Sequence, residues 1–98
     1  MSGTVTHHAT ARAGAFSVQR DGVRAGELTY TREGEAIVAQ HTFVDPAFRG
    51  GTVARDMLAA LVSLARTEHR KIVPRCEYVR GAFERHPGEY ADVAAPPP

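Results

Sequence analysis

Three features are scarce in this 98-residue sequence: cysteine, net charge and long apolar runs. The single cysteine, Cys76, excludes an internal disulfide, and with five scattered histidines it offers no zinc-ligand spacing, so we expect no metal. The balance of 12 Lys and Arg against 11 Asp and Glu argues against a protein that binds nucleic acid or a membrane surface. No apolar run approaches the ~20 residues that cross a bilayer, and the first residues lack the apolar stretch of a signal peptide. We therefore expect a protein of the reducing cytoplasm.

The length allows one domain, without room for separate cofactor and substrate domains. A chain of this size buries only roughly 60–65% of its unfolded surface, so one modest core must hold it together. Residues 1–12 are small and polar, and we expect a flexible N-terminus there. Residues 13–93 are predicted to form a single minimal domain, and residues 94–98, which end in prolines, a disordered tail.

Alternating apolar and polar residues predict three strands, at 13–20, 23–31 and 36–44. Asp21–Gly22 favours a two-residue hairpin turn between the first two strands, because both positions tolerate positive φ. The alternation of the second strand changes phase near Gly26, where we expect a bulge. The third strand has apolar residues on both faces and should lie inside the sheet. Its alternation places His41 on the same face as Ile37 and Phe43.

Apolar residues recur at helical spacing in 52–67 and in 77–85, so both segments are predicted helices. Residues 71–75 between them have the composition of a short strand that ends near Pro74. Because a helix joins the third and fourth strands, these can lie parallel through a right-handed crossover. The predicted fold is α+β, a mixed sheet of about four strands with one parallel junction and two helices.

The loop after the third strand is the best candidate for a binding site. Ligands of such sheets bind outside the carboxyl ends of parallel strands, and there Arg49-Gly50-Gly51 leads into the long helix. Free backbone N–H groups at a helix start suit a phosphate, and glycines let the backbone approach it closely. The alternative is a glycine turn that only starts the helix.

Two side chains near this edge are candidates for reactivity. Cys76 lies beside Arg75 between a strand end and a helix start, a position typical of reactive thiolates, although most lone cysteines are small buried hydrophobes. His41 is a candidate general base, although a histidine on an apolar strand face is more often a core residue. His86, which precedes Pro87, is expected to cap the second helix.

Three motifs follow one another in the second half of the chain. They run His-Thr-Phe-Val-Asp-Pro-Ala-Phe-Arg-Gly from His41, Val-Pro-Arg-Cys-Glu-Tyr-Val from Val73, and Arg-His-Pro-Gly-Glu-Tyr from Arg85. In this order they resemble the small single-domain Gcn5-related N-acetyltransferases, typified by the YjdJ-like bacterial proteins and a plant homologue of minimal size. Three separated matches are far more specific than any one of them alone.

The resemblance implies that acetyl-CoA, without a metal, enters between diverging third and fourth strands. The backbone near Phe43 and Val44 would pair with the pantetheine arm, and the loop amides would hold the pyrophosphate. The implied cofactor-binding residues are Phe43, Val44, Arg49, Gly50, Gly51, Thr52, Val53 and Ala54. The chain departs from the family pattern at an additional Gly88 and at Thr52, which replaces the central loop glycine and either crowds the pyrophosphate or donates a hydrogen bond to it.

The resemblance also implies an acetyl-CoA-dependent N-acetyltransferase in which Cys76 and His41 are catalytic. In one route His41 deprotonates the acceptor amine, which attacks acetyl-CoA directly. In the other, which the position of Cys76 favours, Cys76 first carries the acetyl group as a thioester. The alternative function is a non-catalytic acyl-CoA-binding or protein-interaction module. The acceptor amine is not specified, and an exposed sheet edge would permit a protein partner or a weak dimer.

Overall fold

The computed structural model describes residues 5–96, which contain a five-stranded sheet in the order β1-β2-β3-β4-β5. The strands are Val5–Ala9 (β1), Ala13–Arg20 (β2), Val23–Glu33 (β3), Ala36–Val44 (β4) and Lys71–Pro74 (β5). Neighbours are antiparallel except β4 and β5, which are parallel. The predicted α+β fold with one parallel junction is confirmed, with five strands instead of about four.

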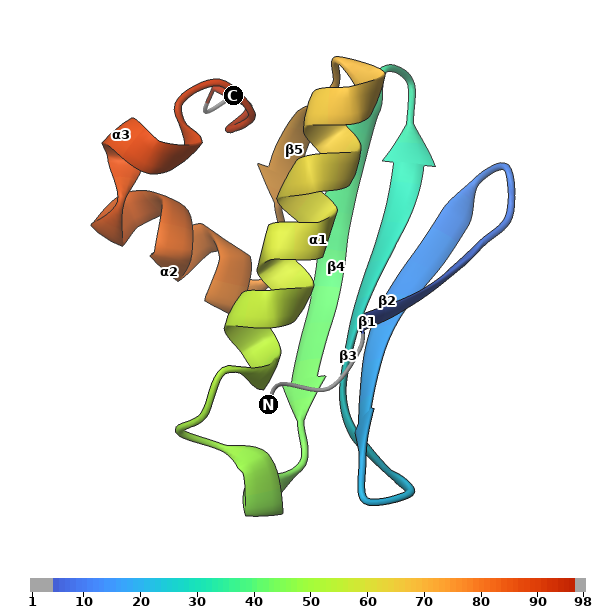
Figure 1. Ribbon diagram of the computed structural model, residues 1–98. Coiled ribbons are helices and arrows are strands. Elements are labelled where there is room, and N and C mark those ends of the chain that lie inside the picture. The colour runs from blue at the N-terminus through green and yellow to red at the C-terminus, as the bar shows by residue number, and fades with distance from the viewer. Residues whose placement is uncertain (1–4, 97–98) are drawn as a thin grey trace.

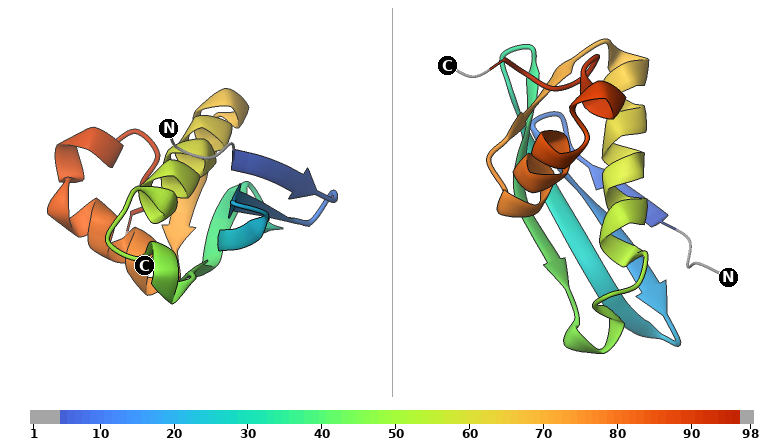
Figure 2. Two further views of the ribbon diagram at one scale, coloured as in Figure 1. Left: turned by 60° about the horizontal axis from the view of Figure 1, so that its bottom comes forward. Right: turned by 90° about the vertical axis from the view of Figure 1, so that its left-hand side faces the viewer.

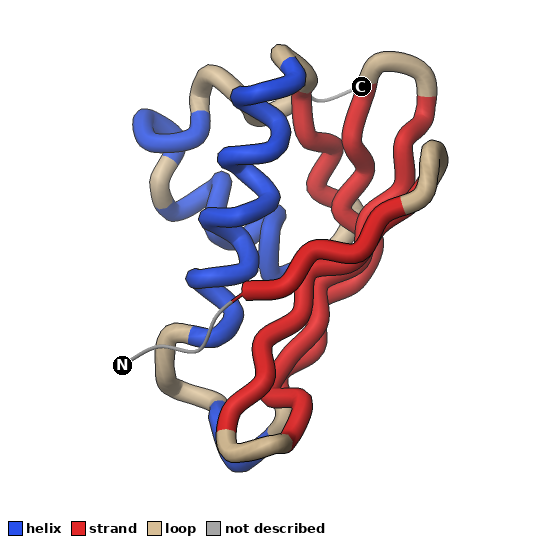
Figure 3. Tube along the Cα trace, turned by 45° about the vertical axis from the view of Figure 1, so that its right-hand side comes forward, coloured by secondary structure: helices blue, strands red, loops and turns tan. Residues whose placement is uncertain are grey.

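The helices lie on one face of this sheet. A 3₁₀ turn, η1 (Pro46–Phe48), precedes the crossover helix α1 (Val53–Glu68), and α2 (Glu77–Arg85) and α3 (Pro87–Tyr90) follow β5. Figure 1 shows α1 running along the sheet with α2 and α3 beside it, and Figure 2 gives the same layers from two other sides. In Figure 3 the opposite face of the sheet carries no helix from residues 5–96. None of the helices in this part of the chain has the length and apolar character needed to cross a membrane.

The hairpin between β2 and β3 follows the prediction from sequence. Asp21 and Gly22 have φ of 54° and 75°, the paired positive values of the expected two-residue turn. Val18 pairs with Gly26 and the next residue of β2 pairs with Arg24, so Ala25 is the additional residue of a bulge. The expected change of phase near Gly26 is therefore confirmed.

Strand β1 was not predicted, because residues 1–12 show no apolar alternation and only Val5 of this strand is half-buried. β1 pairs with β2 along its whole length, and Val5 and His7 contact the rest of the molecule through their side chains. The ring of His7 stacks on Phe16 with the centroids 4.3 Å apart, and its Nε2 lies 2.7 Å from the hydroxyl of Tyr30. Residues 5–9 thus form a strand within the segment that was expected to be a flexible N-terminus, and residues 1–4 lie outside the described part of the chain.

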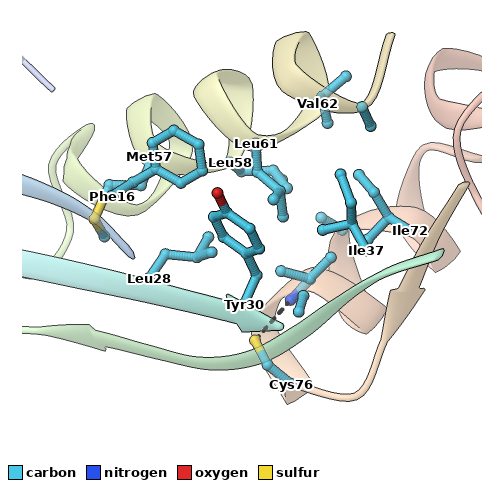
Figure 4. Close-up of a cluster of buried hydrophobic side chains, with 14 of the residues drawn as sticks. Phe16, Leu28, Tyr30, Ile37, Met57, Leu58, Leu61, Val62, Ile72 and Cys76 are labelled. Atoms are coloured by element: carbon cyan, nitrogen blue, oxygen red, sulfur yellow. Dashed lines mark hydrogen bonds between the residues drawn. The ribbon is translucent and has the colours of Figure 1, made fainter. Parts of the chain in front are cut away.

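The core lies between α1 and the sheet, as Figure 4 shows. The apolar stripe of α1 is buried, and its members are Val53, Met57, Leu58, Leu61, Val62 and Ala65. They pack against sheet residues that include Leu28, Tyr30 and Ile37. Burial of a large apolar side chain such as Met57 or Leu61 contributes about 1.5–3 kcal/mol, so this contact holds α1 against the sheet.

The chain after α3 returns to the outer edge of β5. Ala94 forms a parallel bridge with Ile72, and the N–H of Ala95 donates to the Ile72 carbonyl at 2.9 Å. The first residues of the predicted tail are therefore bonded to the sheet, whereas residues 97 and 98 lie outside the described part.

Candidate active site

A bulge in β4 decides which way the candidate side chains point. Ala39 pairs with Tyr30 and His41 pairs with Thr29, so Gln40 is an additional residue without a partner in β3. The bulge reverses the alternation. The sequence predicted that His41 shares a face with Ile37, and this prediction is wrong. Ile37 is buried under the helices, whereas His41 is exposed on the opposite face.

Beyond the bulge, one edge of β4 is open. The parallel pairing of β4 with β5 ends at Ala39 and Pro74, and within residues 5–96 no strand pairs with this side of 40–44. The N–H of Asp45 donates to Ala25, which makes Val44 a non-hydrogen-bonded partner of β3. The backbone groups of Thr42 and Val44 consequently point to the open edge, and those of Phe43 point to β3.

Cys76 lies where β5 ends and α2 begins. Its backbone N–H donates to the Ala39 carbonyl at 2.9 Å, the last link between the two parallel strands. The sulfur caps α2 by accepting from the Val79 N–H at 3.5 Å, drawn as the dashed line in Figure 4. It also lies 3.0 Å from the hydroxyl of Thr42, which the bulge turns toward it. Cys76 is 6% exposed and belongs to the core. It therefore lies at a helix start, as a reactive thiolate would, and is also buried, as a structural cysteine would be.

Cys76 and His41 line the same hollow of about 420 Å³. It is formed by the open part of β4, the end of β5 and the first turn of α2, and its walls are Gln40, His41, Thr42, Arg75, Cys76, Glu77 and Tyr78. We call it the Cys76 pocket. The structure thus brings to one hollow the two residues that were predicted from separate parts of the sequence, although the sulfur contacts Thr42 and Val79 and the His41 side chain lies on the opposite face of the sheet.

Tyr78 connects this pocket with a second one. A hollow of about 490 Å³ lies between α1, α2 and α3, and Tyr78 shares its wall with Arg55, Arg85 and Tyr90. Burial raises the pKa of Tyr78 above its ordinary value, and the neighbouring Tyr90 phenol adds to the shift. Tyr78 therefore carries its proton near neutral pH.

The predicted phosphate loop opens α1. Gly50 has a φ of 84°, which an L side chain rarely adopts, so glycine is required at this turn. Within residues 5–96 the N–H groups of residues 50–55 find no hydrogen-bond acceptor. They lie at the positive end of the α1 dipole, which is the environment that binds anions.

Side-chain hydrogen bonds fix this loop to β2, to the first turn of α1 and to the end of β4. The Thr52 hydroxyl donates to Asp56 and accepts from the Arg20 guanidinium, each at 3.2 Å, and Arg20 lies 3.9 Å from the same Asp56 carboxylate. The Thr52 hydroxyl is thus engaged within the protein. Arg49, expected to supply charge to a phosphate, donates instead from Nε to the Val44 carbonyl at 3.1 Å.

The sequence profile described as GCN5-related N-acetyl-transferase matches residues 15–93, which include every site residue above. The chain belongs to the GCN5-related N-acetyltransferase family. No curated protein sequence matches it.

Solved acetyltransferase structures share the fold of this family member. A ribosomal-protein-alanine N-acetyltransferase from Brucella melitensis biovar Abortus 2308 superposes with a TM-score of 0.65 and 21% identity, over 91% of this chain and 66% of that chain. The aminoglycoside N-acetyltransferase AAC(6')-Iy in complex with CoA superposes with a TM-score of 0.60 and 17% sequence identity, over 78% of this chain and 67% of that chain. For the structure of AAC(6')-Iy with the bisubstrate analogue CoA-S-monomethyl-acetylneamine, the TM-score is 0.60 and the sequence identity 16%. That superposition covers 89% of this chain and 65% of the other chain. The chain spans about two thirds of these proteins, and at such identities the similarity shows the fold.

Four residues of this N-acetyltransferase-family site were not predicted, namely Arg20, Gln40, Glu77 and Tyr78. Tyr78 belongs to the predicted helix 77–85, and a spacing of two from Cys76 does not put two residues on one helix face, so the shared pocket had no signal in the sequence. Arg20 lies far from the loop in sequence, and only the packing of α1 on β2 brings them together.

Proposed function

We propose that this family member transfers an acetyl group from acetyl-CoA to an amine, with Cys76 as the nucleophile and His41 as the base. One observation carries the proposal. Cys76 and His41 share a pocket at the open edge of β4, and the donors at the start of α1 have no acceptor within residues 5–96.

The binding part of the proposal uses backbone groups. The N–H groups of residues 50–55 would hold the pyrophosphate of CoA, and the open edge at Thr42 and Val44 would pair with the amides of the pantetheine arm. Arg49 and Thr52 would act by fixing the loop, because their polar groups already bond to Val44 and Asp56. Because the Val44 carbonyl accepts from Arg49, the Val44 N–H is the group that remains for CoA.

The nucleotide end of CoA would lie in the pocket between the helices. Arg55 and Arg85 line this pocket and supply positive charge, which suits the 3′-phosphate. Tyr78 belongs to both pockets, so an arm that runs from one to the other would pass beside it. A comparison of CoA with dephospho-CoA, which lacks the 3′-phosphate, should show weaker binding of the latter to the wild type and a smaller difference between the two ligands in Arg85→Ala, in which Arg55 remains.

The chemistry proceeds in two balanced halves. First His41 takes the proton of the Cys76 thiol, the sulfur attacks the thioester carbonyl, the bond to the CoA sulfur breaks, and the CoA thiolate leaves with that proton. The neutral amine then attacks the acetyl-cysteine, the Cys76 thiolate leaves, and His41 moves the proton from nitrogen to sulfur. The Thr42 hydroxyl and the Val79 N–H are placed to donate to the sulfur while it carries charge.

Mass spectrometry after mixing the protein with acetyl-CoA tests this order of events. The expected product is a single acetyl adduct on Cys76 that disappears when an amine is added. Cys76→Ser is the sharper control because serine is a good N-cap and should keep α2 intact. Full transfer activity in Cys76→Ala would overturn the covalent route and leave direct attack with His41 as the base.

The second candidate is a non-catalytic acyl-CoA-binding or interaction module, which the low exposure of Cys76 favours. Calorimetric titration with acetyl-CoA, followed by a thiol-release assay over a panel of amines, separates the two. Binding without turnover supports the module, and turnover supports the enzyme.

A further inference from the structure

Glu77 is an acidic side chain in the Cys76 pocket that the chemistry above does not use. It is the first residue of α2, directly after Cys76, and its side chain is exposed. Within residues 5–96 no cation lies within 4 Å of its carboxylate, which is equally true of Glu84 on the same helix, but Glu77 is the one of the two that lines the Cys76 pocket. Glu77 is therefore free to meet a charged ligand.

The other charges of the pocket do not neutralise Glu77. Arg75 also lines the pocket, but its guanidinium is turned to the Glu33 carboxylate, with Nη1 and Oε2 3.8 Å apart. His41 is the other basic side chain of the pocket, and its proposed role as a base requires the imidazole to be neutral when the amine attacks. Among the described residues, Glu77 is therefore the charged side chain of this pocket without an ion-pair partner, which favours a cation as the acceptor.

A neutral side chain of the pocket, Gln40, also favours an acceptor substrate that donates hydrogen bonds. The Gln40 amide donates from Nε2 to the Thr31 hydroxyl at 2.8 Å, which leaves its carbonyl oxygen as an acceptor. An ammonium group carries three donors and no acceptor, so it suits a site that offers carboxylate and amide oxygens.

The approach to the pocket offers apolar surface. His41 and Phe43 lie on the face of the sheet that no helix from the described residues covers, two residues apart and hence on the same side. Phe43 is 44% exposed, unusual for so large an apolar side chain. An aliphatic chain that carried its amine to Glu77 could pack against this ring.

We propose that Glu77 is the specificity-determining residue for the acceptor, and that the acceptor is a primary alkylammonium. This inference rests on the proposed acetyl transfer. Glu77 binds the charged amine and holds its nitrogen beside Cys76. His41 removes the proton that prevents attack and releases it to solvent, and the neutral imidazole then moves the second nitrogen proton to the departing Cys76 sulfur. The same chemistry fits a lysine side chain and a small aliphatic amine.

The first test measures binding without any transfer. n-Butylammonium is titrated into the full chain without acetyl-CoA and followed by backbone amide chemical shifts, with 1-butanol as the uncharged probe. Glu77→Gln should weaken butylammonium binding by roughly 5- to 20-fold, the range for one charge-assisted contact. Glu84→Gln is the matched control, because Glu84 is exposed on the same helix and lines a different hollow.

Equal binding of butylammonium to Glu77→Gln and wild type would overturn the inference, and so would equal affinity of the wild type for butylammonium and butanol. Glu77-dependent binding in a protein that releases no thiol from acetyl-CoA with any amine would support the role of Glu77 and overturn the proposed transfer.

The second test uses transfer kinetics and separates the two sources of the amine. Glu77→Gln should raise the KM for butylamine and for Nα-acetyl-lysine methylamide by roughly 5- to 20-fold and leave the KM for acetyl-CoA unchanged. Methoxyamine, which is uncharged near neutral pH, should react equally well with both proteins. A larger effect for the lysine derivative assigns the acceptor to polypeptide lysines, and equal effects assign it to small alkylamines. An equal loss with methoxyamine would overturn the proposal, because the defect would then not depend on charge.

Discussion

The two halves of β4 belong to one strand but have different environments. Residues 36–39 pair with β3 on one side and β5 on the other, and Ile37, Val38 and Ala39 are buried. Residues 40–44 keep only the pairing with β3, and His41 and Phe43 are exposed. The closed half is therefore fixed by packing, whereas the open half has a backbone edge and side chains available to a ligand. Changes in the closed half should cost stability, and changes in the open half should cost activity.

His41→Gln should produce the largest effect and change activity alone. Loss of a general base typically lowers kcat/KM by about 10²–10⁴-fold. Because His41 is exposed, the free energy of unfolding should change by less than about 0.5 kcal/mol. Thiol release from acetyl-CoA measures the first quantity and urea denaturation the second. Strong destabilisation would place His41 in the core and contradict the assigned face, and full activity would remove it from the chemistry.

The matched pair Ile37→Ala and Phe43→Ala compares apolar residues of the two halves directly. Ile37 is fully buried, so its truncation should cost about 2–5 kcal/mol of unfolding free energy. Phe43 is 44% exposed, and its truncation should cost about 0.5 kcal/mol or less. Urea denaturation of both variants checks the difference. Similar losses would mean that the open half is packed as tightly as the closed half.

Gly26→Ala should disturb the region where the open half meets α1. A Cβ at Gly26 would lie 2.7 Å from Cγ1 of Val53 and 2.9 Å from the Phe43 carbonyl, so α1 could not approach the sheet as it does. We expect a loss of about 1–3 kcal/mol in stability and weaker binding of CoA, because Val53 belongs to the turn that would hold the pyrophosphate. Gly88→Ala is the control, since nothing lies within 4 Å of a Cβ there. Unchanged stability and CoA affinity in Gly26→Ala would show that α1 is not fixed at this contact.

Local sequence was sufficient to predict the bounds of several helices and strands and one turn. The bounds of β2, β4 and α2 follow from apolar periodicity, and the turn at Asp21–Gly22 follows from the φ values that these residues tolerate. The position of Cys76 between β5 and α2 also followed from the order of the elements. In each case the determinant is local or is a regular repeat of burial.

The open parts depended on contacts that a regular pattern does not encode. Alternation through Ala39, Gln40 and His41 looks unbroken, so the bulge that exposes His41 leaves no trace in the pattern. In β1 the ring of His7 stacks on Phe16, its partner in the neighbouring strand β2, and this cross-strand contact leaves no apolar alternation in the sequence. Contacts of this kind are decided by tertiary packing rather than by local preference.

An ion pair joins β3, the neighbour of the closed half of β4, to the C-terminal end of α1, and its pH dependence gives the smallest predicted effect. Arg32 lies opposite Ile37 in the sheet and donates to both carboxylate oxygens of Glu68. Hydrogen bonding from Arg32 lowers the pKa of Glu68 below its unfolded value near 4.5. Glu68 therefore stabilises the fold fully above that value, and the contribution is lost as the pH falls through the lower folded pKa.

Glu68→Gln should thus reduce the unfolding free energy by about 1 kcal/mol at pH 7, a modest value because both side chains are partly exposed. Urea denaturation at pH 7, 5 and 3 should show the gap between wild type and variant narrowing toward pH 3. Glu35→Gln, at an exposed carboxylate beside the start of β4, should show no such gap at any pH. A gap for Glu68→Gln that stays constant with pH would mean that packing of the side chain, rather than its charge, joins α1 to β3.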